Sequence, residues 1–297
     1  MDDKHRIEQA LATALSAQQG ADGPPRLAQA MQDAVFPGGA RIRPLLTLAI
    51  AQACGADDLG LAAAAGSAIE LMHCASLVHD DLPCFDNALT RRGRPSVFAA
   101  HGERLAVLAG DALIVTAFQS LASAGCGAPE RLALLLQTLA GAVGAPAGII
   151  AGQAWDCEPR VALAAYQRAK TGALFVAATV AGAQAAGMAA EPWRALGEWL
   201  GEAYQVADDI RDVAGDPDTL GKPTGQDAAH GRPSSAAELG LSGAIQHFDQ
   251  LIAAASAAIP SCRGSAQLRT LVRLEAKRLV PLELTRRLAP SVARIPA

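Results

Sequence analysis

Aromatic residues are scarce in this sequence. Phe, Trp and Tyr make up only 4% of its 297 residues, whereas 51% are hydrophobic and Ala is abundant. Small apolar side chains favour helices that pack closely together over a fold rich in strands. No alternation of Val, Ile and Thr indicates a sheet. The composition therefore predicts an all-α protein.

No run of basic residues is present, and the formal net charge is −4. Nucleic-acid binding depends on clustered Lys and Arg that displace counterions, so we expect no nucleic-acid partner.

The six Cys form no Cys-x-x-Cys pair, and the charged first residues include no apolar core of a secretory signal. Both features favour a cytoplasmic protein with reduced thiols.

Two long segments, residues 132–155 and 171–190, contain no charged side chain. Each is long enough to cross a bilayer. Ala, Gly, Gln and Pro dilute their hydrophobicity, which makes insertion unfavourable compared with a Leu-rich segment. We expect buried helices here and no membrane span.

Helical signals recur along the chain, separated by short turns that contain Gly or Pro. The expected helices cover residues 6–15, 25–35, 41–54, 60–81, 103–123, 129–151, 161–188, 191–213, 235–256 and 265–286. No linker or repeat divides them, so we predict a single domain over residues 1–297 with about ten helices. Residues 214–227 form the longest turn-rich segment, and a loop of that length is often functional.

Two acidic clusters stand at the ends of apolar stretches. The first contains Asp80, Asp81 and Asp86, and Pro83 interrupts the helix between them. That interruption should bring the three carboxylates to one site. In the second cluster, Asp208 and Asp212 share a helix face, whereas Asp209 is turned about 100° away.

Carboxylates on one helix face repel each other unless a cation lies between them. Clusters of oxygen ligands near Lys and Arg are typical of Mg²⁺ sites that bind phosphate substrates. Two solvated helix ends are the alternative. The presence of two clusters, with Arg91, Arg92 and Lys222 nearby, favours the metal site.

These motifs resemble those of the trans-isoprenyl diphosphate synthases, the polyprenyl synthetase family. The clusters match its two aspartate-rich motifs, and the likeness extends over residues 35–240. Further matching segments are Gly38-Gly39-Ala40-Arg41-Ile42-Arg43-Pro44, Arg91-Arg92-Gly93-Arg94-Pro95-Ser96, Gly110-Asp111-Ala112-Leu113, Gly152-Gln153-Ala154-Trp155-Asp156, Lys170-Thr171-Gly172-Ala173-Leu174-Phe175 and Gly221-Lys222-Pro223-Thr224-Gly225-Gln226-Asp227.

The resemblance implies a helical bundle around a central cavity and an Mg²⁺-dependent prenyltransferase, commonly a homodimer. In this family an allylic diphosphate loses its diphosphate, and isopentenyl diphosphate attacks the carbocation. The implied metal ligands are Asp80, Asp81, Asp86, Asp208 and Asp212. The implied allylic diphosphate ligands are Arg91, Lys170, Thr171, Gln205, Lys222 and Arg232, with Lys170 and Lys222 catalytic. The implied isopentenyl diphosphate site consists of Arg41, Arg43, His73 and Arg92.

Two of these residues have ordinary alternatives when they are considered without the family. Lys170 could be a surface lysine, and His73 could be a core histidine with satisfied hydrogen bonds. The sequence also departs from the family pattern at Ala40, where Lys is usual, and at Arg232, where Lys is common. The missing cation at Ala40 predicts weaker binding of isopentenyl diphosphate.

The product chain should extend along the helix that precedes Asp80. In the family, a bulky aromatic residue about five positions before this motif tends to stop growth at C15. Ala75 and Ser76 leave that level open, and Met72 lies about one turn further. We therefore expect geranylgeranyl diphosphate, C20, although other walls such as Phe118 could limit the length.

Three other functions remain open at this stage: a farnesyl diphosphate synthase, a non-catalytic modulatory subunit of a prenyl synthase, and a terpene cyclase. A modulatory subunit typically loses one acidic motif, and a cyclase has a different second metal motif. Both motifs are intact here, which favours chain elongation.

Overall fold

The computed structural model describes residues 2–20, 23–36, 38–159, 163–214 and 234–280, and helices dominate these ranges. The prediction of an all-α bundle is confirmed. The first helices are α1 (Asp3–Ser16), α2 (Pro25–Val35), α3 (Ile42–Ala53), α4 (Leu59–Asp80), α5 (Val97–His101), α6 (Glu103–Gly125), α7 (Pro129–Val143) and α8 (Ile149–Ala154).

The 3₁₀ turn Trp155–Cys157 follows α8. The later elements are α9 (Leu163–Gln167), the π-helical turn Arg168–Gly172, α10 (Ala173–Ala185), the 3₁₀ turn Glu191–Trp193, α11 (Arg194–Ala214), α14 (Ser235–Ala257) and α15 (Ser265–Leu279). Two short strands, β1 (Thr90–Arg91) and β2 (Arg94–Pro95), form an antiparallel hairpin.

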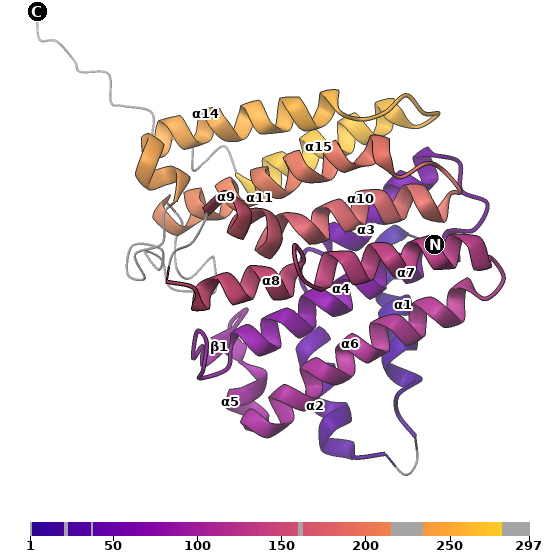
Figure 1. Cartoon of the computed structure of the whole chain (residues 1–297), viewed down its shortest axis with the longest axis vertical. Coiled ribbons are helices and arrows are strands. Elements are labelled where there is room, and N and C mark those ends of the chain that lie inside the picture. Colours follow the sequence, from indigo (N-terminus) through magenta and orange to yellow (C-terminus); the bar gives the residue numbers. More distant parts are fainter. Residues whose placement is uncertain (1, 21–22, 37, 160–162, 215–233, 281–297) are drawn as a thin grey trace, which may run out of the picture.

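The long helix α4 lies in the middle of the bundle and contacts α1, α2, α3, α6, α7 and α10. Figure 1 shows α14 and α15 on one side of the molecule, α2 and α6 on the opposite side, and α4 and α10 between them. Asp58 begins α4 as its N-cap, since its carboxylate accepts hydrogen bonds from the backbone N–H groups of Gly60 and Leu61. This helix carries the first acidic cluster from the core to the end of the bundle.

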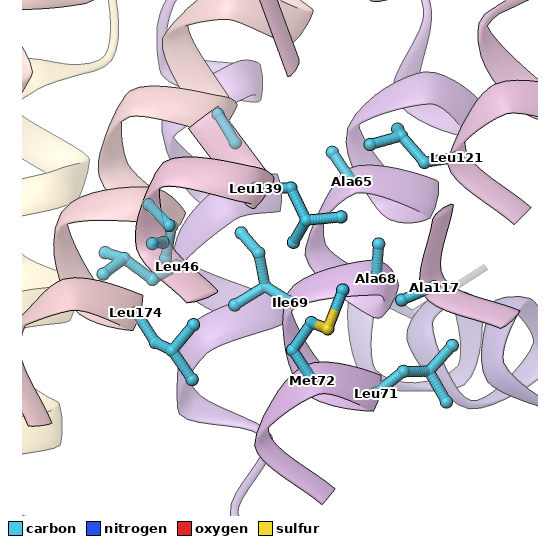
Figure 2. Close-up of a cluster of buried hydrophobic side chains, with 14 of the residues drawn as sticks. Leu46, Ala65, Ala68, Ile69, Leu71, Met72, Ala117, Leu121, Leu139 and Leu174 are labelled. Atoms are coloured by element: carbon cyan, nitrogen blue, oxygen red, sulfur yellow. The ribbon is translucent and has the colours of Figure 1, made fainter. Parts of the chain in front are cut away.

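The main core consists mostly of Leu, Ile, Val and Ala side chains, and α1, α3, α4, α6, α7 and α10 contribute most of them. Figure 2 shows part of it, where Ile69 and Met72 of α4 lie in one cluster with Leu139 of α7 and Leu174 of α10. A second cluster joins α11, α14 and α15. Small residues let the helices approach closely: a Cβ atom on Gly182 would lie 2.6 Å from the carbonyl oxygen of Thr47.

The structure departs from the expected helices at three places. Residues 129–151 form two helices, because Gly144-Ala-Pro-Ala-Gly148 interrupts them. A π-helical turn interrupts the helix expected over residues 161–188. The hairpin at residues 90–95 was not predicted, and its turn residues Arg92 and Gly93 both have positive φ angles.

The helices that are long and apolar enough to cross a membrane lie outside the two uncharged segments. In the described ranges only α4 and α6 have the length and hydropathy to cross a bilayer, and 78% of the relevant window of α4 is buried inside the protein. α10, within residues 171–190, has only 13 residues, about 20 Å of helix. A bilayer core is about 30 Å thick. α10 is therefore too short to cross a bilayer, which agrees with the prediction of a buried helix.

Candidate active site

A cavity of about 1180 Å³ opens between α4, α8, the π-helical turn, α10 and α11. Acidic side chains of both predicted clusters reach it, together with cations from other elements and apolar side chains at its deeper end. One space therefore brings together residues as far apart in the sequence as Arg43 and Arg211.

Three of the predicted metal ligands line this cavity from two walls: Asp80 and Asp86 from the end of α4 and the turn after it, and Asp208 from α11. The helix ends as expected before Pro83, and the backbone N–H of Asp86 donates to the carbonyl of Asp80 at 3.0 Å. Burial raises the pKa of Asp80, which the ammonium group of Lys170 opposes and the carboxylate of Asp86 reinforces. A cation between these acids would relieve the cost of burying them.

Asp81 was predicted as a metal ligand, but the structure places it elsewhere. It is 2% exposed, it lines a separate cavity of about 220 Å³, and its carboxylate pairs with the guanidinium group of Arg91. Consecutive helical residues differ by about 100° in direction, so Asp81 cannot follow Asp80 into the main cavity. It positions Arg91, which lines both cavities.

Asp212 is buried on α11 and is not among the residues that line the main cavity. The predicted residues Lys222 and Arg232 lie outside the described residues, so their roles stay predictions.

The acids that line the cavity fit Mg²⁺ in their chemistry. Within the described ranges, no three Asp, Glu, His or Cys side chains form a complete metal site by themselves. Mg²⁺ is commonly held by one or two carboxylates together with water and substrate phosphates. Asp80, Asp86 and Asp208 offer such a set of oxygen donors on facing walls.

Lys170 extends from the π-helical turn toward the acids. Its Nζ lies 2.8 Å from Oδ2 of Asp156 and 3.7 Å from Oδ1 of Asp80, and the Gln153 amide donates to the same Asp80 oxygen at 2.8 Å. Burial lowers the pKa of Lys170, but these carboxylates outweigh that effect and the net pKa is raised. Lys170 therefore stays charged, as binding to a diphosphate requires.

Gly152 lets the π-helical turn lie close against α8. A Cβ atom at this position would lie 2.4 Å from the backbone nitrogen of Lys170. No other residue fits without moving that turn, which places Lys170 and Thr171 in the cavity. Such single π-helical turns are common at functional sites.

The basic part of the cavity contains Arg43, His73 and Arg92. Arg43 is 7% exposed, and its guanidinium carbon lies 4.7 Å from the ring centre of Phe175 and 5.6 Å from that of Tyr204. Its Nε has no hydrogen-bond partner among the described residues. A buried guanidinium with an open donor suits an anionic ligand.

His73 and Arg92 complete this region. Desolvation and then the nearby Arg43 and Arg92 lower the pKa of His73 well below its usual value, so its imidazole is neutral. Arg92 donates to the carbonyl of Gly38, which connects the β1–β2 hairpin to the Gly-Gly-Ala loop.

Arg41 was predicted to belong to the isopentenyl diphosphate site, and its charge is one of the causes that lower the pKa of His73. Its side chain is fully buried between Glu8 and Glu70, with N–O distances of 2.8 Å and 2.9 Å, and it also donates to the carbonyl of Val35. Two carboxylates offset its charge, and it is not among the residues that line the main cavity. Arg41 is a structural residue that joins α1, α4 and the start of α3.

The apolar end of the cavity follows α4 away from the acids. Met72, Ala75 and Ser76 line it, together with Ile114, Val143 and Leu174. Ala75 leaves the space open, and Met72 lies at the deeper level next to the core of Figure 2. Phe118 packs against the core but is not among the lining residues.

Sequence reasoning gave no role to four residues that the structure brings to the site. Gln153 and Asp156 lie in a motif that had been noted, and their spacing of three was the available signal. Tyr204 and Asp209 flank the predicted ligands Gln205 and Asp208. Their contacts with Arg43, Phe175 and Ser235 depend on how the other helices pack, so the sequence gave no signal for these contacts.

A helical bundle whose cavity combines carboxylates, arginines and an apolar end defines the isoprenoid-synthase class of proteins. The polyprenyl synthetase model matches residues 24–261. The chain therefore belongs to the polyprenyl synthetase family.

Relatives agree with this assignment. The geranylgeranyl diphosphate synthase of Cereibacter sphaeroides is 52% identical over 96% of this chain and 99% of its own length. That of Rhodobacter capsulatus is 51% identical over 93% of this chain and 96% of its own length. The structure of a Helicobacter pylori geranyltransferase with magnesium and isoprenyl diphosphate has a TM-score of 0.80, 29% identity, and coverage of 93% and 96% of the two chains.

Proposed function

We propose that this protein condenses isopentenyl diphosphate with dimethylallyl, geranyl and farnesyl diphosphates to give geranylgeranyl diphosphate. The prediction of a chain-elongating prenyltransferase is confirmed by the family and its relatives. The observation that supports the C20 product is the apolar end of the cavity, which is open at Ala75 and reaches Met72. The farnesyl alternative has less support.

The side chains divide the reaction between two regions. Lys170 and Arg91 face the region of the leaving diphosphate, and Asp80, Asp86 and Asp208 would hold Mg²⁺ there. When bound, Mg²⁺ would supply positive charge to the diphosphate oxygens as the allylic C–O bond breaks. Arg43, His73 and Arg92 bind the second diphosphate, which must be retained. The apolar wall keeps water away from the carbocation.

Incubation of the protein with Mg²⁺, labelled isopentenyl diphosphate and each allylic diphosphate in turn tests this function. We expect incorporation with all three allylic substrates and a C20 product. A cyclised hydrocarbon would instead indicate a terpene cyclase, and no product without a second protein would indicate a modulatory subunit.

Replacement of Ala75 by Phe is expected to change the main product from C20 to C15. Ala75 is 1% exposed and lines the cavity about five residues before Asp80. Moving the end of the cavity from Met72 to residue 75 removes about one turn, or about 5 Å, which is close to one isoprene unit. Chromatography of dephosphorylated products measures this, with Ala75→Ser as a control that keeps C20. An unchanged C20 product in Ala75→Phe would contradict the assignment.

Replacement of Ala40 by Lys is expected to lower the KM for isopentenyl diphosphate about tenfold, since a charged hydrogen bond contributes about 1.5 kcal/mol or more. Ala40 is exposed in the loop whose Gly38 carbonyl accepts from Arg92, so a longer side chain has room. Initial rates at fixed farnesyl diphosphate give this KM, and Ala40→Gln is the neutral control. Equal KM values for the Lys variant and wild type would contradict the prediction that Ala40 weakens the binding of isopentenyl diphosphate.

We also propose a homodimer that forms through α6 and α7. Val107, Leu108 and Val115 of α6 are 41%, 52% and 53% exposed, and Leu134 of α7 is 47% exposed. Apolar side chains concentrated on two neighbouring helices favour burial against a second copy. Light scattering of the purified protein gives the mass that tests this.

Two further predictions stay proposals: one domain over residues 1–297, and a cytoplasmic location. Contacts of α1 with α4 and of α15 with α3 support the single domain. All six Cys are free thiols, which supports a reducing compartment.

A further inference from the structure

Two cysteines that the mechanism above does not use meet at the end of α3. Cys54 is the C-cap residue of α3, and Cys262 lies between α14 and α15. Both are partly buried against the main core. The pKa of Cys54 is raised to about 11, first by burial and then by Cys262, with which its thiol forms a hydrogen bond. The two sulfur atoms are therefore neighbours, although the residues stand far apart in the sequence.

Backbone contacts hold this pair of cysteines together. The backbone N–H of Gly264 donates to the carbonyl of Ala53, the residue before Cys54, at 3.0 Å. A Cβ atom on Gly264 would lie 2.5 Å from Cα of Ala53, so glycine is needed for the two backbones to come this close. The N–H of Ser265 donates to the carbonyl of Cys262 at 3.2 Å and closes the turn. The proximity of the thiols thus depends on how the two segments fold, not on flexible side chains.

We propose that Cys54 and Cys262 are a redox modification site, at which a peroxide converts the two thiols into a disulfide. The sulfur atoms of a disulfide are about 2.05 Å apart, so thiols that are already hydrogen-bonded need only a small movement to form one. Both side chains are partly exposed, which gives a small oxidant access to them. In a reducing compartment the pair stays as two thiols, and the disulfide forms when peroxide is present.

The reaction uses one molecule of peroxide for each disulfide. The raised pKa of Cys54 keeps the proton on this residue, so the thiolate of Cys262 is the nucleophile. It attacks one peroxide oxygen, the O–O bond breaks, and the leaving hydroxide takes up the proton that Cys262 released. The sulfur of Cys54 then loses its proton and attacks the sulfenic acid of Cys262, the S–O bond breaks, and a second water forms. The two thiols lose two electrons in total, and the peroxide gains them.

The disulfide would fasten two layers of the bundle together. α14 and α15 pack with α11 in the second cluster, whereas Cys54 ends a helix of the main core. A crosslink between distant residues stabilises a protein mainly by restricting the unfolded chain. Neither cysteine is among the residues that line the reaction cavity. We therefore expect the disulfide to raise stability and to leave kcat within about twofold of that of the reduced protein.

The experiment treats the reduced, full-length protein with a small excess of hydrogen peroxide and then removes the oxidant. We expect the number of free thiols, counted in the unfolded protein, to fall from six to four, because one intramolecular disulfide consumes two. Peptide mapping without reductant should show Cys54 joined to Cys262. The unfolding temperature should rise by about 5 °C or more, and dithiothreitol should reverse both changes.

Three variants identify the cysteines that react. Cys54→Ser and Cys262→Ser should each lose the rise in unfolding temperature on oxidation. In Cys54→Ser the sulfenic acid of Cys262 has no second thiol to attack it, so dimedone should label Cys262. Cys126→Ser, which removes an exposed cysteine, is the matched control and should still form the disulfide.

Three outcomes would overturn the proposal: a disulfide between other cysteines, a crosslink between two chains, or a Cys54–Cys262 disulfide that leaves the unfolding temperature unchanged. Loss of thiols without any crosslink would also overturn it. The thiol count and the peptide map use the wild-type protein, so they remain decisive where a serine variant fails to fold. Neither readout depends on prenyl transfer, so a failure of the proposed function is a separate result.

Discussion

The Asp80→Asn variant is expected to have a kcat about 10²- to 10³-fold below that of wild type, the scale of a lost oriented electrostatic contact at a reacting group. Asp80 lines the cavity, accepts a hydrogen bond from Gln153, and lies 3.7 Å from Nζ of Lys170. On the proposed function, removal of its negative charge would weaken the binding of Mg²⁺, and it would leave Lys170 with one carboxylate partner fewer. Steady-state incorporation of labelled isopentenyl diphosphate over a series of Mg²⁺ concentrations measures both effects.

Asp249→Asn provides the matched control, because Asp249 is an exposed acid on α14. Its kcat should stay within about twofold of wild type, since exposed substitutions away from a site have small effects. If Asp80→Asn retained full activity at every Mg²⁺ concentration, the cavity would not be the site of the reaction. A normal unfolding temperature of Asp80→Asn would show that the loss is not caused by misfolding.

The Glu70→Ala variant is expected to lower the free energy of unfolding by about 3 kcal/mol or more, the range found when one partner of a buried ion pair is removed. Glu70 is 2% exposed, and its Oε1 lies 2.9 Å from NH1 of Arg41, whose side chain is fully buried. The variant leaves that guanidinium with only Glu8 as its acidic partner. Urea denaturation gives the change, together with the slope that shows whether unfolding stays two-state.

Two comparisons separate charge from packing at this position. Glu275→Ala removes a partner of the exposed Arg278 and should change stability by at most about 1 kcal/mol. The double variant Arg41→Met with Glu70→Leu removes both buried charges and should be more stable than Glu70→Ala alone. A double variant that is less stable than the single one would mean that the ion pair itself contributes to stability.

The helices could be predicted from the sequence because each has its own signals. α2 begins at Pro25 and ends at Val35 as expected, and the predicted bounds of α3 and α4 differ by one residue at each end. Local hydrophobic periodicity and capping are properties of neighbouring residues. The break at Gly144–Gly148 and the π-helical turn at Arg168 were missed, because the apolar residues around each of them are typical of one continuous helix.

The site was predicted less completely than the fold. The break at Pro83 predicted that Asp80 and Asp86 line the same site. Asp81 instead pairs with Arg91, and this contact depends on the position of the hairpin. The difference between Arg41 and Arg43 could not be foreseen. Both arginines lie in the same motif, but one packs between Glu8 and Glu70 and the other lies against Phe175 and Tyr204.

The sequence by itself determined the helical class, the family, and the small side chain at Ala75 on which the predicted C20 product depends. These are local properties: side-chain size, periodicity and the order of motifs. Only the tertiary structure decided which charges meet. Hydrogen bonds from Thr171 to Gln205, from Gln205 to Asp209 and from the Ser235 backbone to Asp209 connect residues as far apart as positions 171 and 235. A hydrogen bond has a direction and a length that exist only once the helices have packed, so no pattern along the chain could specify it.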